Sequence, residues 1–353
     1  MTSPKFIISK NKILEQVGNL KELGLKVSYS YKTNRDVGDL LQEISDVDFS
    51  VHAFEEIEMF KDKSRIWFFT QAESEKELEE LLSLGIKNFV IDNEVDLERM
   101  LKVLEKTKCK INVSLRMKFS EHRIGTGKYF VYGMSSRKVN ELILKLGENK
   151  NIGKLGIHIH RKSQNTSEWE LLGELKDSLI PEVLGKIKIV NLGGGLPSVY
   201  RSSTYDVFPY IFSKIKEAVD WLAEKGIETY IEPGRFVAAP SVKLETEIVQ
   251  VYENNIVVNV SIYNCALDTV LTHTKMLVEG ELGENEVGEN FLIKGNSPTR
   301  DDIFRYRVKL NPEKVKVGEK IVFLNAGAYN YATDFFGYKK VGFEVGDYHN
   351  FYK

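Results

Sequence analysis

The sequence predicts an α/β protein: a (β/α)8 TIM barrel followed by a smaller, mostly antiparallel C-terminal β-domain. Between about residues 10 and 240, short runs rich in β-branched and aromatic residues alternate with helix-like stretches, which is typical of parallel βα units. Eight such runs can be counted, and eight is the strand number of the closed barrel. After about residue 240, strand-like runs follow one another across turns, which indicates a second fold class.

The eight predicted barrel strands each end in polar or glycine-containing residues. In chain order they are KVSYSYK (26–32), DFSVHA (48–53), RIWFFTQ (65–71), NFVIDN (88–93), KINVSLRMK (110–118), KLGIHIH (154–160), KIVNLGGG (188–195) and ETYIEPG (228–234). Helix-like segments follow several of them: VGDLLQEI (37–44), FEEIEMF (54–60), EKELEELLSLG (75–85) and EVDLERMLKVLEK (94–106). Since active sites of such barrels lie at the C-terminal ends of the strands, these polar residues are expected to share one mouth.

The β-domain is predicted from five strand-like runs: KLETEIVQVYE (243–253), NIVVNVSIY (255–263), NFLIKGN (290–296), RYRVKL (305–310) and EKIVFLN (319–325). The acidic, glycine-containing segment 280–290 is expected to be an exposed hairpin loop. We therefore expect a barrel over residues 10–240 and a β-domain over 241–353, with residues 1–9 as candidates to join the second domain.

Composition excludes several classes of function. The 49 Lys and Arg residues balance 51 Asp and Glu residues, so the net charge of -2 offers no overall field for a nucleic acid or an anionic membrane. Cys109 and Cys265 are too few for a disulfide framework or a four-thiolate metal site. Without a signal-peptide pattern at the start or an uncharged run of about 18 residues, a cytoplasmic protein is expected.

Lysine and histidine side chains stand at two of the predicted strand ends. Lys32 ends the first strand, where it is either a solvated residue or a Schiff-base lysine. His158 and His160 lie on the same side of a later strand, with Ser163 after them. These two histidines are either buried and hydrogen-bonded or part of a site. A metal site is disfavoured because no carboxylate or thiol lies at ligand spacing, so no metal is expected.

Two further strand ends suggest a bound phosphate. The run Gly193–Gly195 places backbone N–H groups where they can close on a phosphate, although glycine runs also form simple turns. Glu232 and Arg235 end the next strand, either as a surface pair or as part of a phosphate clamp. A phosphorylated cofactor together with a strand-end lysine indicates pyridoxal 5′-phosphate.

Six blocks of sequence then identify a family resemblance. SYSYK (28–32), EHRIGTGKYFVYG (121–133), GIHIHRKSQ (156–164), NLGGGLP (191–197), IEPGRFVAAPS (231–241) and NAGAYNYATDFFGY (325–338) occur in family order over nearly the whole chain. Together they resemble the fold type III pyridoxal-phosphate decarboxylases, the group that contains ornithine and diaminopimelate decarboxylases. Within it, the siderophore or natural-product and carboxynorspermidine decarboxylases are the most similar.

The resemblance implies a role for each matching residue. Lys32 would hold the cofactor covalently, His160 would stack on the pyridine ring, and Glu232 would keep the pyridine nitrogen protonated. The remaining cofactor-binding set is Arg116, His158, Ser163, Gly193, Gly194, Gly195, Gly234, Arg235 and Tyr329, of which Ser163, the three glycines, Arg235 and Tyr329 would hold the phosphate. Alanine racemases share the barrel but place an arginine against that nitrogen, so Glu232 favours decarboxylation over racemisation.

The family completes its active site with a segment of a second subunit, which implies a homodimer. The matching run here is GNSPTRDDIFRYRV (295–308), with Thr299 and Asp302 in register. The substrate-binding set implied by the resemblance is Asp268, Thr299, Arg300 and Asp302. A weak match to the carboxynorspermidine decarboxylases would put Asp268 near the substrate's distal group, although an exposed strand end is the alternative. Arg300 would suit a substrate with a distal carboxylate.

The chain departs from the family pattern at three places. Pro298 replaces the cysteine that is thought to return a proton to Cα, and Cys265 does not match that cysteine by position. Ser50 stands where the family usually carries Asp, and Arg161 and Lys162 replace an Ile-Gly pair. An amino-acid decarboxylase is the function predicted. The alternatives are a pyridoxal-phosphate racemase and a non-catalytic, cofactor-binding homologue.

Overall fold

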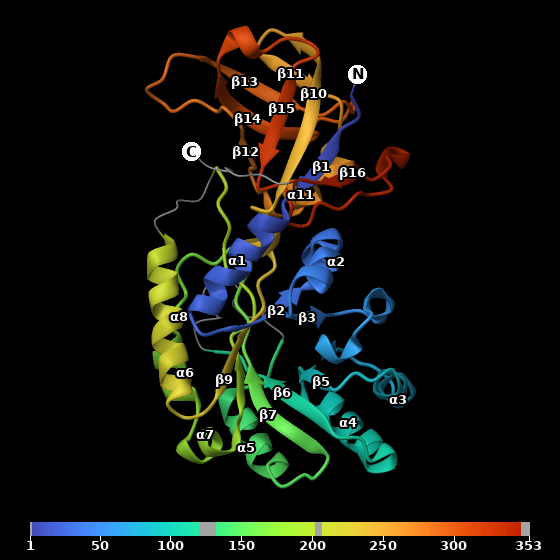
Figure 1. The fold of residues 1–353 in the computed structure, drawn as a ribbon, viewed down its shortest axis with the longest axis vertical. Helices are drawn as coiled ribbons and strands as arrows, with labels where there is room; N and C mark the ends of the chain where they lie inside the picture. The colour runs from blue at the N-terminus through green and yellow to red at the C-terminus, as the bar shows by residue number, and fades with distance from the viewer. Residues whose placement is uncertain (1, 120–131, 202–206, 347–353) are drawn as a thin grey trace.

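The computed structural model describes residues 2–119, 132–201 and 207–346, so that most of the block 121–133 lies outside the described residues. The strands form a closed barrel and, next to it, a separate sheet (Figure 1). In the described residues, no helix is both long enough and apolar enough to span a membrane.

The barrel contains the eight strands that the sequence predicts. They are β2 (Lys26–Ser30), β3 (Asp48–Val51), β4 (Ile66–Thr70), β5 (Asn88–Ile91), β6 (Ile111–Arg116), β7 (Ile152–His158), β8 (Ile189–Asn191) and β9 (Glu228–Ile231). Each strand pairs in parallel with the next, and β2 pairs in parallel with β9 to close the barrel. The predicted fold class is therefore confirmed, and all eight C-terminal strand ends lie at one mouth.

Helices cover the outside of the barrel (Figure 1). They are α1 (Lys10–Glu22), α2 (Arg35–Ile44), α3 (Glu75–Ser83), α4 (Glu94–Thr107), α5 (Ser136–Leu146), α6 (Leu171–Ser178), α7 (Pro181–Lys186), α8 (Val207–Ala223) and α9 (Arg235–Ala238). Several begin at a polar cap: the Ser74 hydroxyl accepts from the Glu77 amide while the Glu77 carboxylate accepts from Ser74. The predicted helical stretch 54–60 is instead a 3₁₀ segment, η2 (Phe54–Met59); η1 (Tyr31–Thr33) and η3 (Lys63–Arg65) are also 3₁₀.

Large side chains fill the barrel interior below the mouth. Trp67, Val90, Ile189 and Tyr230 form one buried cluster from four strands. The rings of Trp67 and Tyr230 meet at 5.5 Å although β4 and β9 are not neighbours, so their contact crosses the interior. Ser28 and Ser50 share a buried hydrogen bond of 2.8 Å between β2 and β3. Ser50, which replaces a family aspartate, is thus a neutral hydrogen-bond partner of Ser28.

The second sheet is mostly antiparallel, as predicted. Its strands are β1 (Lys5–Ile8), β10 (Val242–Tyr252), β11 (Asn255–Val258), β12 (Leu277–Val278), β13 (Glu289–Lys294), β14 (Ile303–Leu310), β15 (Lys320–Leu324) and β16 (Gly342–Val345). β1 pairs antiparallel with β10 and parallel with β16, so the first strand of the chain lies in this sheet (Figure 1). Two 3₁₀ segments, η6 (Pro312–Lys314) and η7 (Phe335–Gly337), lie in the same half of the chain.

Two local expectations for this half of the chain are wrong. Segment 280–290 is not a hairpin loop, because β12 pairs with β15 whereas β13 pairs with β11 and β14. The strand predicted over 255–263 ends at Val258, and two short helices follow, α10 (Ile262–Cys265) and α11 (Leu267–Thr272). Ser261 explains this change, because its hydroxyl accepts from the Tyr263 amide and caps α10.

Candidate functional site

Polar side chains line the mouth of the barrel, each two residues after an apolar interior residue. Asp92 follows Val90 on β5, Asn191 follows Ile189 on β8 and Glu232 follows Tyr230 on β9. Because side chains alternate between the two faces of a strand, this spacing keeps them on the inner face. The strand ends are therefore apolar within the barrel and polar at the mouth.

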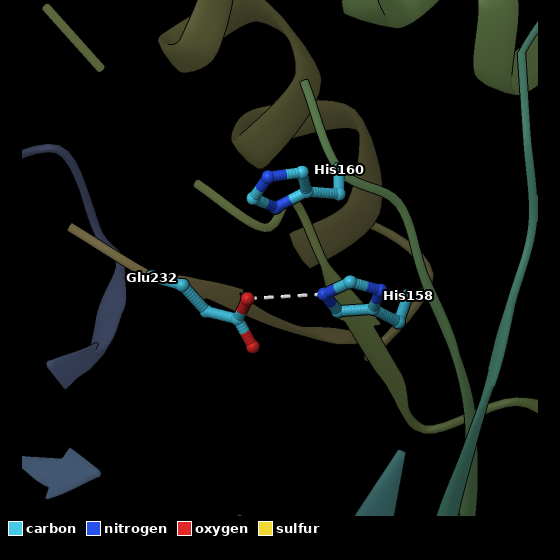
Figure 2. Close-up of side chains that lie close together, drawn as sticks. All are labelled: His158, His160 and Glu232. Carbon is cyan, nitrogen blue, oxygen red and sulfur yellow. Dashed lines mark hydrogen bonds and ion pairs between the residues drawn. The ribbon is translucent and has the colours of Figure 1, made fainter. Parts of the chain in front are cut away.

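Glu232 is the buried carboxylate of this mouth. Only 4% of the residue is exposed, and its Oε1 accepts from Asn191 Nδ2 at 2.8 Å while its Oε2 lies 3.0 Å from His158 Nε2 (Figure 2). Burial raises the pKa of Glu232, but His158, His160 and Asn191 together outweigh burial, so that the pKa lies below its ordinary value. The group is consequently an ionised carboxylate that can face a cation.

His158 and His160 lie beside that carboxylate, and one donor atom from each of the three side chains lies within 4.8 Å of the others (Figure 2). A carboxylate therefore does approach the histidines, contrary to the sequence-based argument from ligand spacing. His160 Nδ1 accepts from the Gly194 amide at 3.2 Å, and burial lowers the pKa of His160 well below its ordinary range. Its ring is therefore neutral near pH 7 and presents a flat face at the mouth.

Lys32 lies in η1, directly after β2. The turn is held by two backbone hydrogen bonds, from Ser30 to the Pro233 carbonyl at 3.1 Å and from Tyr329 to the Thr33 carbonyl at 2.9 Å. The second bond joins the barrel to the loop after β15, so both parts of the chain position Lys32. Desolvation among the surrounding protein atoms lowers the pKa of the Lys32 amine, as does the nearby Arg116, while Glu232 opposes the shift.

This lowered pKa predicts the pH dependence of imine formation at Lys32. Only a neutral amine attacks an aldehyde, so a pKa below the ordinary 10.5 makes the amine reactive at lower pH. Initial rates of reaction with pyridoxal phosphate, followed by absorbance, should rise with pH and then reach a plateau. The protein should reach this plateau at a lower pH than free Nα-acetyl-lysine. Coincident profiles for the protein and the free amine would contradict the lowered pKa.

The glycines at the ends of β8 and β9 lie in close contact with neighbouring turns. A Cβ on Gly193 would lie 1.9 Å from the Ile159 carbonyl oxygen, and the residue has a φ of +67°. A Cβ on Gly234 would lie 2.2 Å from Thr33 Oγ1. At position 193 only glycine is tolerated, because the contact is with backbone and φ is positive. The two strand ends therefore pack tightly against the turns that carry His160 and Lys32.

Arg235, the first residue of α9, is buried beside these glycines and is fixed by its neighbours. Its Nη1 donates to Tyr200 Oη at 2.9 Å and to Asp268 Oδ2 at 2.5 Å, and its Nη2 donates to Asp268 Oδ1 at 3.0 Å. The guanidinium also lies over the rings of Tyr200 and Tyr329, at 5.5 and 5.2 Å from their centroids. Its buried Nε has no hydrogen-bond partner. Arg235 is thus held rigidly by three of its five N–H donors, and the Nε donor is among those left unused.

Asp268 is placed differently from the sequence-based expectation. It lies in helix α11, is 5% exposed and uses both carboxylate oxygens on Arg235, while Oδ1 also accepts from Thr272 Oγ1 at 3.0 Å. It is therefore neither an exposed strand end nor free to bind the distal group of a substrate. Its position is set by the nearby guanidinium, whose charge it neutralises.

Removing the Asp268 carboxylate should destabilise the fold. Asp268→Ala leaves the guanidinium of Arg235 buried without its counter-ion, and we expect a loss of about 3 kcal/mol in the free energy of unfolding. Urea unfolding monitored by circular dichroism measures it. The control is Asp301→Ala, whose side chain is 66% exposed and paired with Arg300, with an expected change below about 0.5 kcal/mol. Equal effects of the two substitutions would refute the buried-pair argument.

Asp302 is likewise not available to a substrate in this structure. The residue is fully buried, and its carboxylate accepts from the amides of Ile262 at 2.9 Å and Ser297 at 3.0 Å. These backbone bonds fix the loop between β13 and β14. Thr299 Oγ1 shares a 2.6 Å hydrogen bond with Ser297 Oγ, whereas the Arg300 side chain is 92% exposed. Of the expected substrate-binding set, Arg300 is thus the most accessible.

Several mouth residues were not identified from sequence. Half-buried His52, after β3, stacks on Phe69 at 4.5 Å, and the edge of Phe69 faces His158 at 5.2 Å. Asp92 pairs with Arg116 at 3.2 Å, which fixes that arginine at the end of β6. Burial and the nearby Lys32 lower the pKa of His52 well below its ordinary range. Its position at the end of a predicted strand was the only sequence signal for it.

The comparisons with known proteins agree with this geometry. The family model described as "Pyridoxal-dependent decarboxylase, pyridoxal binding domain" matches residues 11–239. The chain belongs to this family of pyridoxal-dependent decarboxylases. The match covers the whole barrel, including Lys32, His160, Glu232 and Arg235. The family resemblance inferred from the six sequence blocks is thereby confirmed, as is the expectation of a pyridoxal-phosphate cofactor.

Other members of the pyridoxal-dependent decarboxylases are distant in sequence. Ornithine decarboxylase of Mus musculus is 24% identical over 279 residues, covering 71% of this chain and 58% of the relative. Diaminopimelate decarboxylase of Vibrio cholerae is 29% identical over 201 residues, covering 53% of this chain and 47% of the relative. The chain thus spans about half to three fifths of the length of these two curated relatives.

Solved structures show the same fold over almost the entire chain. Lysine decarboxylase of Selenomonas ruminantium superposes with a TM-score of 0.78 at 19% identity, covering 98% of this chain and 93% of that one. Diaminopimelate decarboxylase of Helicobacter pylori, solved with L-lysine, gives a TM-score of 0.78 at 20% identity, with coverages of 98% and 92%. At this identity the likeness establishes the fold.

The residues of this family member fit the cofactor. Pyridoxal phosphate needs an amine for its aldehyde, an anion for its pyridine nitrogen and donors for its phosphate. Lys32 offers an amine of lowered pKa, and Glu232 offers a buried, ionised carboxylate. The buried Nε of Arg235 is a hydrogen-bond donor without a partner, and it can therefore donate to a phosphate oxygen. All three requirements are met at one mouth.

Proposed function

We propose that this protein removes the α-carboxylate of an amino acid with pyridoxal 5′-phosphate as cofactor. The observation that carries the proposal is Glu232, a buried carboxylate of lowered pKa at the barrel mouth that also holds Lys32. An ionised group there stabilises a protonated pyridine nitrogen. A racemase would be better served by a weaker electron sink, so Glu232 favours decarboxylation.

In the mechanism, each residue has a distinct task. The bound cofactor supplies an electron sink for the pair left behind when the bond between Cα and the carboxylate breaks. Glu232 keeps the proton on the pyridine nitrogen, and His158 and Asn191 hold the carboxylate in place. Lys32 would anchor the cofactor through its amine. The neutral ring of His160 would pack against the pyridine face.

The phosphate end would be held by Ser163, the backbone of Gly193, Gly194 and Gly195, the Nε of Arg235, and Tyr329. Tyr329 supports this placement, since its ring lies 5.2 Å from the Arg235 guanidinium and its backbone amide reaches the turn of Lys32. Arg116 is held by Asp92 at the end of β6 and lowers the pKa of Lys32, so its charge would act near the aldehyde end of the cofactor.

The return of a proton to Cα needs a donor other than a cysteine. Pro298 occupies the matching position, and Cys265 cannot substitute. Burial raises the pKa of the Cys265 thiol well above its ordinary range. Its Sγ donates a hydrogen bond to the Ser261 carbonyl at the start of α10. We propose that water entering through the mouth, or Lys32 after its displacement, provides this proton.

The proposal extends to the oligomeric state and to the class of substrate. A homodimer would bring the exposed Arg300 of one copy to the mouth of another, where a guanidinium suits an amino acid with a distal carboxylate. Two relatives are an ornithine decarboxylase and a diaminopimelate decarboxylase, so polyamine, lysine or siderophore precursors define the substrate panel. Sedimentation showing a fully active monomer would exclude the dimer, and a clear preference for ornithine or lysine would exclude the distal carboxylate.

Two successive measurements test the proposed function. The visible absorbance of the purified, cofactor-loaded protein should disappear on borohydride reduction, and peptide mapping should find a pyridoxyl group on Lys32. Amino acids with basic and acidic side chains are then assayed for CO2 release and for inversion at Cα. Release of CO2 supports the decarboxylase, whereas inversion without change of mass supports the racemase. No label on Lys32 would favour a non-catalytic homologue.

A further inference from the structure

A cavity of about 700 Å³ opens beside Arg235 at the phosphate end of the proposed cofactor site. Its walls come from the loop after β7, from Tyr200, from Arg235 and from the segment that follows α11. Among the described residues that line it, Lys162, Arg235 and His273 are the basic ones, and there is no carboxylate. Ser163, Thr272 and Thr274 add hydroxyl groups to the wall. The cavity is therefore built for an anion.

The arginine alone does not supply net positive charge to this cavity. Asp268 lies behind Arg235 and binds both of its Nη atoms, so the buried pair carries no net charge. What remains toward a ligand is the N–H of Nε and the second N–H of Nη2, which are donors on a guanidinium whose charge is already balanced. A phosphate monoester carries between one and two negative charges near pH 7. Removing its hydrating water costs free energy unless cations take the place of that water. A further cation is needed to balance it.

Lys162 is the cation that lines the same cavity. Its carbonyl oxygen lies 3.0 Å from the position that a Cβ on Gly195 would take, which places its backbone against the proposed phosphate-binding glycines. Arg161, its neighbour, turns the other way: its Nε donates to the Glu168 carbonyl at 2.6 Å and its guanidinium lies over the rings of Phe119 and Trp169. Of this basic pair, only Lys162 faces the cavity.

We infer that Lys162 contributes the compensating positive charge that binds the cofactor's phosphate in this chain, an inference that rests on the proposed cofactor site. A glycine, which the family resemblance places at this position, has no side chain to do so. Lys162 thus supplies a positive charge in place of the charge of Arg235, which Asp268 neutralises. Because Lys162 is exposed, its contribution is a screened attraction and not a rigid contact.

The test compares two aldehydes that differ only in the phosphate. Apo-protein is titrated at about pH 8, where histidine is mostly neutral, with pyridoxal phosphate and with pyridoxal, and binding is read from absorbance. Lys162→Ala should weaken pyridoxal phosphate binding by about three- to tenfold and leave pyridoxal binding unchanged. Lys162→Arg should restore most of the affinity. Added salt should weaken cofactor binding more in the wild type than in Lys162→Ala.

Matched controls separate the possible failures. Lys188→Ala removes an exposed lysine next to the start of β8, at the opposite end of the barrel, and should change neither affinity. Equal pyridoxal phosphate affinities in wild type and Lys162→Ala, or a parallel loss for pyridoxal, would overturn the role of Lys162. Borohydride labelling of Lys32 in the wild type would then still support the cofactor site. No labelling in the wild type would overturn both proposals.

Discussion

Lys32→Ala is expected to abolish decarboxylation, with a fall in kcat of about 10³-fold or more. The substitution removes the amine that anchors the cofactor and that exchanges with the substrate's amine. Because the Lys32 side chain is exposed at the mouth, its removal leaves no buried cavity and should cost little stability. The visible absorbance of the bound cofactor should be lost, as should borohydride labelling at residue 32, while the circular dichroism spectrum remains that of the wild type.

Lys26 offers a control on the same strand. It begins β2 at the opposite end of the barrel, where it pairs with Glu228 at 3.0 Å. Lys26→Ala should retain the cofactor absorbance and nearly all of the activity, because it removes only an exposed ion pair. A labelled and active Lys32→Ala variant would show that another lysine anchors the cofactor. It would also remove the basis for assigning the site to this mouth.

Glu232→Gln is expected to lower kcat by about 10²- to 10³-fold while the cofactor still binds. The amide keeps the shape of the side chain and removes its charge, so the pyridine nitrogen loses the anion that keeps it protonated. The absorbance of the bound cofactor and borohydride labelling of Lys32 should persist, which separates this effect from loss of the cofactor. Reaction with pyridoxal phosphate should also show a Lys32 pKa lower still, since Glu232 is the main group that raises it.

The matched control again lies at the other end of the same strand. Glu228 begins β9 and pairs with Lys26 and Lys154 at 3.0 and 2.8 Å, with about a third of its side chain exposed. Glu228→Gln should change kcat less than twofold, since an exposed pair contributes about 1 kcal/mol or less and only to stability. An unchanged kcat in Glu232→Gln would refute the electron-sink role and revive the racemase as the better hypothesis.

The two substitutions act at a site that both halves of the chain hold together. Asn34 caps α2 through its side-chain oxygen and donates from Nδ2 to the Gly327 carbonyl at 2.8 Å. Gly327 in turn lies so close to α9 that a Cβ would stand 1.9 Å from the Ala238 carbonyl oxygen. The late block 325–338 is therefore packed against the turn of Lys32 and the end of α9. This contact explains why a motif near the end of the chain belongs to the site.

The barrel and most of the cofactor site could be predicted from the sequence because their determinants are local. The alternation of strand-like and helix-like runs marks eight βα units, and the period of two along a strand puts Asp92, Asn191 and Glu232 on the inner face. Each strand end can therefore be predicted from its own residues, without knowledge of the rest of the chain. Lys32, His160 and Arg235 were predicted in this way, and the structure places each of them a few residues after the end of a barrel strand.

The partners of the buried charges were decided only by the tertiary structure. Asp268 and Arg235 are 33 residues apart, and His158 and Glu232 are 74 apart, so sequence spacing carries no record of either pair. Asp302, expected at a substrate, is instead held by backbone amides, because a buried carboxylate must satisfy its oxygens with the nearest donors. The sequence by itself determined which strand ends reach the mouth and several of the side chains on them. Closure of the barrel and its packing against the second sheet determined what each of them contacts, since those contacts depend on non-local geometry.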